Sequence, residues 1–316
     1  MQVNDVKQVG VVGAGVMGHG IAINSALWGY PTLLNDISDD VLKKSVDNID
    51  YMLNIFVDER LIDRKRADET INLITPTTDL EKLAKTSDFV TEAIIERAEE
   101  KRELFTNLDK MCPPHTILAS NTSSLTLSDF TSDVKRQDKL VLTHYFSPPS
   151  IVPGVEVAKG ASGSDESFNV TYELLKRWHK VPIKILKEVP GYVVNSLQFA
   201  ILQEAYKLWA DGVATAEEID YGARMTMGFR FLQEGPLQRV EMAGLWNWPP
   251  ELRAQIINSS LNKTPPNAEQ LAKIQEHWEK GKPWFIDREN MQASVDPAYR
   301  YYAKLLKKEF WPKDKD

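Results

Sequence analysis

The segment VGVVGAGVMGHGIA near the N-terminus limits the fold of this chain more than any other stretch. It contains Gly13, Gly15 and Gly18 in a G-x-G-x-x-G pattern, which follows an apolar run and opens a helical pattern. The first glycine permits a tight turn, the second lets the backbone approach a pyrophosphate, and the third lets helix and strand pack closely. The pattern therefore predicts the strand, turn and helix of a dinucleotide-binding sheet, with N–H groups of the helix facing the anion.

The first part of the chain, residues 1–189, alternates β-branched runs with helical periodicity, which indicates a parallel α/β sheet of the Rossmann type, doubly wound. After the first strand, further strands are expected in YPTLLND, DFVTEAI, HTILASNT, DKLVLTHYF, GVEVA and VPIKILKE. Residues 38–73 predict a helical excursion with Ser38 as N-cap. Residues 190–316 predict an all-helical second domain, because no credible strand follows Pro190.

Composition excludes several classes of protein. The net charge of -7 offers no basic surface for nucleic acid, and the apolar runs are too short to cross a bilayer. A single cysteine, Cys112, excludes an internal disulfide and a cysteine-cluster metal site, and the five histidines lack the spacing of metal ligands. The N-terminus lacks the regions of a secretory signal. We therefore expect a cytoplasmic enzyme that acts on a small molecule, with no metal, membrane or nucleic-acid partner.

The second predicted strand ends in an acid, Asp36, about 20 residues after the glycine turn. A carboxylate at this position accepts hydrogen bonds from ribose hydroxyls and repels a 2′-phosphate, and no arginine stands nearby in LLNDISDD. The alternative is a glycine-rich turn followed by an aspartate that only caps a helix. The order of strand, turn and helix favours a cofactor site, and the acid favours NAD over NADP.

Two ionisable residues interrupt apolar runs farther along the chain: His144 in LVLTHYF and Glu156 in GVEVA. Histidine is well suited to accept a proton near neutral pH, and a carboxylate can orient its ring and stabilise the imidazolium. Antiparallel pairing across the proline-rich loop between the two runs would bring the side chains together. The alternative is a buried histidine with satisfied hydrogen bonds. Together with a dinucleotide domain, the pair favours the base of a hydride-transfer reaction.

Six blocks of the sequence resemble the L-3-hydroxyacyl-CoA dehydrogenase family in their order and spacing. They are GVVGAGVMGHGIA, TEAIIERAEEKRELF, ILASNTSSL, HYFSPPSIVPGVEV, VPGYVVNSLQFAILQEA and EGPLQRVEMAGL. The family includes 3-hydroxybutyryl-CoA dehydrogenases and the related L-gulonate 3-dehydrogenase (lambda-crystallin type) and carnitine dehydrogenase branches. The resemblance implies NAD-dependent oxidation of an L-3-hydroxyacyl-CoA to the 3-ketoacyl-CoA, in fatty acid metabolism, by a homodimer that forms through the helical domain.

The resemblance also implies the roles of four catalytic residues. His144 would take the proton of the 3-hydroxyl group, and Glu156 would hold the histidine ring. Ser123 would hydrogen-bond the substrate oxygen, although Ser124 competes for this role and a serine here is also a common turn residue. Asn195 would help to fix substrate and histidine, and the alternative is a helix N-cap.

The expected cofactor site extends beyond the glycine turn. In the family, the positions of Glu96 and Lys101 line the nicotinamide and substrate, although a solvated helix face is an equally good interpretation of this charged segment. The predicted cofactor-binding residues are Gly13, Gly15, Val16, Met17, Gly18, Asp36, Glu96, Lys101 and Asn121.

The chain departs from the family where the substrate would bind. Ser147 and Gly154 replace an asparagine and a leucine in and beside the proline-rich loop, and Ser196 replaces an arginine. The cations that could meet the phosphates of coenzyme A, in ERLIDRKRADE and DDVLKK, are interleaved with acids. Three hypotheses stay open: the acyl-CoA reaction, the same chemistry on a free 3-hydroxy acid such as L-gulonate or carnitine, and a catalytically silent NAD-binding protein. The predicted catalytic set favours an enzyme.

Overall fold

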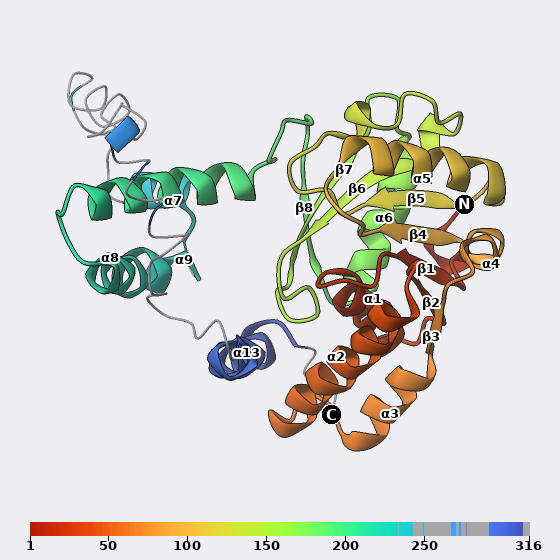
Figure 1. The fold of residues 1–316 in the computed structure, drawn as a ribbon, viewed down its shortest axis with the longest axis horizontal. Coiled ribbons are helices and arrows are strands. Elements are labelled where there is room, and N and C mark those ends of the chain that lie inside the picture. The colour runs from red at the N-terminus through yellow and green to blue at the C-terminus, as the bar shows by residue number, and fades with distance from the viewer. Residues whose placement is uncertain are drawn as a thin grey trace. The chain divides into compact units, whose positions relative to one another are not determined.

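The protein is known here from a computed structural model, which describes residues 1–232, 234–242, 249, 267–269, 272, 276 and 291–311. Contacts divide the chain into two units: Met1–Val193 together with Val295–Asp316, and Val194–Ser294. Figure 1 shows a sheet flanked by helices in the first unit and helices in the second. The predicted order of an α/β sheet followed by a helical region is therefore confirmed.

One sheet of eight strands forms the centre of the first unit. The strands are β1 (Val9–Val12), β2 (Thr32–Asn35), β3 (Ile74–Thr77), β4 (Phe89–Glu92), β5 (Ile117–Ser120), β6 (Leu140–Tyr145), β7 (Gly154–Lys159) and β8 (Val181–Lys184). Their order is β3-β2-β1-β4-β5-β6-β7-β8, and the strands are parallel except that β7 runs antiparallel to β6, with β8 parallel to β7. This order reverses between β1 and β4, and open α/β sheets bind ligands at such a switch point.

The helices connect the strands and build the second unit. They are α1 (Gly18–Leu27), α2 (Asp39–Asp58), α3 (Arg64–Asn72), α4 (Leu80–Thr86), α5 (Ala98–Met111), α6 (Asp165–Arg177), α7 (Val194–Ala210), α8 (Ala216–Ala223), α9 (Phe229–Phe231), α10 (Pro236–Met242) and α13 (Met291–Glu309). Short helical turns are η1 (Val3–Asp5), η2 (Leu127–Asp129), η3 (Gln137–Lys139) and η4 (Arg224–Gly228). The predicted excursion after Ser38 is the α2–α3 hairpin, and Ser38 caps α2 as expected.

All the strands that the sequence predicts are present, but β3 is an additional strand. It pairs only with β2 and so forms one edge of the sheet. Its sequence, ITPT, contains Pro76, which cannot donate a ladder hydrogen bond, and its middle residues are exposed. An edge strand with this composition lacks the apolar alternation that marked the other strands, which explains why the sequence did not predict it.

The core of the first unit lies on both faces of the sheet. One face packs against α1, α2 and α6, and the other against α4 and α5. The last described helix, α13, also joins the first of these cores, through buried Ala303 and Leu306. Arg300 of α13 forms an ion pair with Asp58 at 3.1 Å. The expected helical domain of residues 190–316 thus differs from the structure at its end, because apolar and ionic contacts hold α13 on the first unit.

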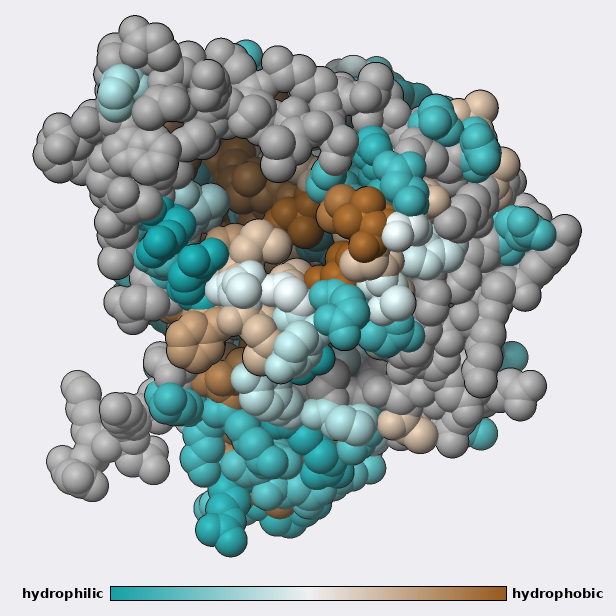
Figure 2. All heavy atoms as spheres, turned by 90° about the vertical axis from the view of Figure 1, so that its left-hand side faces the viewer, coloured by the Kyte–Doolittle hydropathy of each residue, from teal (hydrophilic) through white to brown (hydrophobic). Residues whose placement is uncertain are grey.

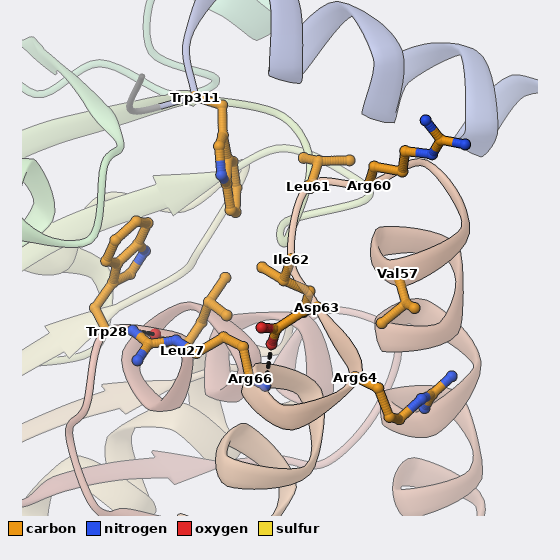
Figure 3. Close-up of a pocket in the computed structure, with 10 residues that line it drawn as sticks. All are labelled: Leu27, Trp28, Val57, Arg60, Leu61, Ile62, Asp63, Arg64, Arg66 and Trp311. Atoms are coloured by element: carbon orange, nitrogen blue, oxygen red, sulfur yellow. Dashed lines mark hydrogen bonds between the residues drawn. The ribbon is translucent and has the colours of Figure 1, made fainter. Parts of the chain in front are cut away.

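A hollow of about 770 Å³ lies where the end of α13 meets α1 and the α2–α3 turn. Figure 3 shows the indole rings of Trp28 and Trp311 on one side of it, with the Arg66 side chain reaching beneath Trp28. The two indole centroids are 5.7 Å apart. Because Trp28 follows the C-terminal end of α1, this hollow lies at the opposite end of the helix from the glycine turn.

Candidate active site

The glycine turn between β1 and α1 requires glycine at two positions. Gly13 adopts a φ of +97°, and a Cβ there would lie 2.5 Å from a neighbouring backbone oxygen. A Cβ on Gly18 would lie 1.7 Å from the oxygen of Gly13. Gly15 has open space about its Cα, Val16 is exposed, and Met17, the N-cap of α1, makes no side-chain capping bond. The N-terminus of α1 is therefore open to an anion.

Asp36 directly follows β2 and forms a hydrogen bond with the backbone of the glycine turn. One carboxylate oxygen accepts a hydrogen bond from the N–H of Ala14 at 2.9 Å, and Ser38, not Asp36, caps α2. Asp36 and the turn border a cleft of about 540 Å³. The cleft also contains Ile37, 98% exposed, and Ile95, 58% exposed, which the sequence did not single out. An apolar residue directly after the strand-ending acid was the available signal, since such exposure suits a flat apolar ligand group.

Lys101 is buried between two glutamates at the carboxyl end of β4. Its Nζ lies 2.6 Å from an oxygen of Glu92 and 3.1 Å from an oxygen of Glu96, and its side chain is only 1% exposed. The interpretation as a solvated helix face is therefore wrong for Lys101. Burial raises the pKa of Glu92, and the charge of Lys101 and a hydrogen bond from Ser120 oppose this rise. Lys101 thus connects α5 to Glu92, the last residue of β4, and to Glu96, in the turn that follows β4.

Glu96 in turn organises the serine segment that follows β5. One of its oxygens accepts from the N–H groups of Ser123 and Ser124, both at 2.8 Å, and from the hydroxyl of Thr122 at 2.6 Å. Burial favours a raised pKa for Glu96, but hydrogen bonds from Thr122 and Ser124 and the charge of Lys101 lower it to about 2. The Ser124 hydroxyl lies 3.0 Å from this carboxylate and that of Ser123 3.4 Å. The Glu96 carboxylate therefore holds the hydroxyl of Ser124 more closely than the hydroxyl of Ser123, while it binds both backbone N–H groups equally.

His144 and Glu156 face each other across the β6–β7 pair. The two residues are direct partners in the antiparallel register that the sequence predicted. Nδ1 of His144 lies 2.8 Å from a carboxylate oxygen of Glu156, and both side chains are buried. A carboxylate only accepts, so Nδ1 carries the hydrogen and Nε2 is left as the acceptor. The second oxygen of Glu156 accepts from the N–H of Val193 at 2.9 Å, and the rings of Phe146 and Tyr192 lie beside the imidazole.

The two predicted asparagines lie in different units. Asn121 follows β5, and its side-chain oxygen accepts from the N–H of Tyr145 at 2.9 Å, directly after His144. Asn195 is the second residue of α7, in the second unit, and lies inside the helix instead of at an N-cap. Within the first unit, the structure thus connects the glycine turn to Asp36, Glu96 to the serine segment, and His144 to Glu156.

The first unit therefore combines an open helix N-terminus, a carboxylate at the end of β2 and a buried histidine whose ring is held by a carboxylate. Such a set can bind a dinucleotide and take a proton from a hydroxyl group. The described residues contain no group of three or more histidine, cysteine, aspartate or glutamate side chains that could hold a metal ion. None of the helices in the part of the chain that the structure describes is long and apolar enough to span a membrane.

Comparisons with known proteins identify the cofactor and the type of enzyme. The chain matches the family 3-hydroxyacyl-CoA dehydrogenase, NAD binding domain, over residues 8–189, and its C-terminal domain over residues 191–282. Human mitochondrial hydroxyacyl-coenzyme A dehydrogenase is 34% identical over 245 residues, 76% of this chain and 77% of the human protein. The 3-hydroxybutyryl-CoA dehydrogenase of Clostridioides difficile is 34% identical over 75% of this chain and 83% of its own. A solved structure of a diketoreductase that acts on dicarbonyl compounds is 28% identical, with a TM-score of 0.70 over 87% of this chain and 93% of its own.

Proposed function

Because the chain belongs to the 3-hydroxyacyl-CoA dehydrogenase family and is an NAD-dependent oxidoreductase, we propose that it oxidises an L-3-hydroxyacyl-CoA, such as 3-hydroxybutyryl-CoA, to the 3-ketoacyl-CoA. The buried contact between His144 and Glu156 carries the proposal, since hydroxyl oxidation needs a proton acceptor with a fixed ring. NAD, when bound, accepts the hydride that leaves C3 of the substrate.

In this proposal, residues of the chain transfer the proton and bind the substrate and the cofactor. Nε2 of His144 accepts the hydroxyl proton, while Glu156 keeps the ring in the required tautomer and offsets the charge of the imidazolium. The Ser123 hydroxyl donates to the same substrate oxygen, and Glu96 holds the serine segment through its backbone N–H groups. Asn195 of α7 contributes an amide to the substrate. Asp36 accepts from the ribose, and the open N-terminus of α1 faces the pyrophosphate.

A second candidate is the same chemistry on a free 3-hydroxy acid of the L-gulonate or carnitine type. The similarity to a diketoreductase supports it, because the substrates described for that protein are dicarbonyl compounds, a class that is not restricted to CoA thioesters. The cations of α3 also support it: Lys65 and Arg66 each lie 3.9 Å from a carboxylate oxygen of Glu69. Cations that already face a carboxylate attract the phosphates of coenzyme A less strongly.

One parallel assay separates these candidates. NADH formation is followed with L-3-hydroxybutyryl-CoA, L-gulonate and carnitine as substrates of the purified protein. We expect turnover of the CoA thioester; turnover of the free acids alone would refute the acyl-CoA proposal and support the second candidate. NAD binding without turnover of any 3-hydroxy substrate would instead support a catalytically silent protein.

We also propose that the protein is located in the cytoplasm. We further propose that it forms a homodimer through its helical unit. None of the residues of α7 is buried, and the helix exposes several large apolar side chains: Leu197, Phe199, Ile201 and Leu202. Figure 2 shows apolar residues, coloured brown, gathered near the centre of the face that it presents. Light scattering should give twice the chain mass, and Phe199→Glu should lower it; a wild-type monomer would refute the proposal.

A further inference from the structure

A buried lysine outside the predicted site contacts the loop that joins the base to its partner. Lys180 directly precedes β8, and its residue exposure is only 6%. Its Nζ donates hydrogen bonds to the carbonyl oxygens of Pro149 at 2.6 Å and Val152 at 3.1 Å. Within the described residues Lys180 takes part in no ion pair. Both acceptors lie in the loop of residues 146–153, between the strand of His144 and the strand of Glu156.

Burying this ammonium group without a carboxylate is costly. A charged group removed from water loses hydration that two carbonyl dipoles replace only in part. Burial accordingly lowers the pKa of Lys180 to about 7. An apolar side chain would fill the same space without this cost, but it could not donate to the two carbonyl oxygens, which points to a role for these contacts beyond packing.

Helix α1, which follows the glycine turn, also contacts this loop. The side-chain amide of Asn24 in α1 donates to the Pro149 oxygen at 3.0 Å, so that one carbonyl receives donors from α1 and from Lys180. Gly20 of α1 permits this approach, because a Cβ there would lie 2.6 Å from the Pro149 ring. Phe146, at the start of the loop, places its ring 4.4 Å from the His144 ring. The loop therefore links the helix of the glycine turn to the histidine.

We propose that Lys180 is a positioning residue for proton transfer, which fixes residues 146–153 against α1 and thereby holds the His144 ring in its working orientation. The inference rests on the proposed function of His144 as the base. A small displacement of a general base is expensive, since a misplacement of about 1 Å can lower a rate by about 100-fold. Lys180 touches neither substrate nor cofactor in this proposal and acts only through the loop.

The test uses three variants of the full-length protein. Lys180→Met keeps the length of the side chain and removes its donors, and Lys180→Arg keeps N–H donors. Leu174→Ala opens a cavity in α6, where Leu174 is fully buried, without removing a hydrogen bond to the loop. We expect Lys180→Met to lower kcat by about 10- to 100-fold with unchanged NADH affinity, and Lys180→Arg to recover part of the loss. Leu174→Ala should lower the melting temperature and leave kcat unchanged. Wild-type kcat in Lys180→Met, or an equal loss in Leu174→Ala, would overturn the inference.

A second readout does not depend on turnover and separates this inference from the proposed function. The imidazole nitrogen NMR signals of His144, assigned among the five histidines with His144→Gln, should shift in Lys180→Met and not in Leu174→Ala. Unchanged signals would overturn the inference even if the enzyme is active. If Lys180→Met does not fold, Asn24→Leu removes the other donor to the Pro149 oxygen and should shift the same signals; their constancy would also overturn it.

Discussion

Replacing Glu156 by glutamine changes one oxygen of a buried side chain into an NH₂ group and leaves its shape. In the wild type, one carboxylate oxygen accepts from Nδ1 of His144 at 2.8 Å and the other from the N–H of Val193 at 2.9 Å. The glutamine oxygen must face Val193, because an NH₂ group there would oppose a backbone donor. The NH₂ group then faces the imidazole, where the wild type has an acceptor.

This exchange reverses the histidine tautomer. Nδ1 becomes an acceptor, the hydrogen moves to Nε2, and the atom that should take the substrate proton is occupied. We expect kcat to fall by about 10²–10⁴, because general-base catalysis is lost while cofactor and substrate contacts stay in place. In transition-state terms this is about 3–5 kcal/mol. Affinity for NADH should stay at the wild-type level, since neither Asp36 nor the glycine turn contacts Glu156.

The assay compares NADH formation by the wild type, Glu156→Gln and Glu166→Gln with the substrate that the wild type turns over. Glu166 is the matched control: it is half exposed and bonds the N-terminal amine and Lys139. The same change there should leave kcat unaltered. A Glu156→Gln enzyme with wild-type kcat and a folded circular dichroism spectrum would refute the assigned role of the pair.

Three further outcomes are expected elsewhere in the first unit. Asp36→Ala should weaken the discrimination against NADP, measured as the ratio of kcat/KM for the two cofactors, and an unchanged ratio would make Asp36 structural only. Leu306→Ala should lower the free energy of unfolding by about 2–5 kcal/mol in denaturant titrations, whereas Tyr301→Ala, at an exposed position of the same helix, should change it little. The pKa of Glu96 is lowered to about 2, so its contribution to stability is present above the ordinary glutamate pKa of 4.5 and is lost as pH falls from there toward 2. The difference in melting temperature between wild type and Glu96→Gln should therefore shrink over that pH range; a constant difference would contradict the low pKa.

The elements that the sequence predicted share one property: their signals are local. An apolar run predicts a buried strand whichever strand it pairs with. His144 and Glu156, 12 residues apart, lie close together because a short loop joins adjacent antiparallel strands. The strand β3 has no such run, since it lies at an edge and contains Pro76.

Contacts with residues that lie far away along the chain, or with backbone atoms that every residue possesses, could not be predicted from the sequence. A lysine in a charged helix has the same local pattern whether it faces water or, like Lys101, two buried glutamates. Lys180 binds backbone carbonyl oxygens, which every residue possesses, so no pattern of side chains marks its acceptors. The position of α13 depends on partners on α2 that lie far away along the chain; Tyr51 and Asp296, for example, are 245 residues apart.

The return of α13 to the first unit has a consequence for how the chain is made. Ala303 and Leu306 fill a core whose other members were synthesised much earlier, in α1, α2 and the first strands. A ribosome makes a chain from its N-terminus, so the nucleotide-binding unit cannot complete this core until α13 has been synthesised, which happens after the helical unit. Nascent chains that stop before residue 295 should therefore expose the α2 surface to chaperones, and α13 closes the fold of the first unit.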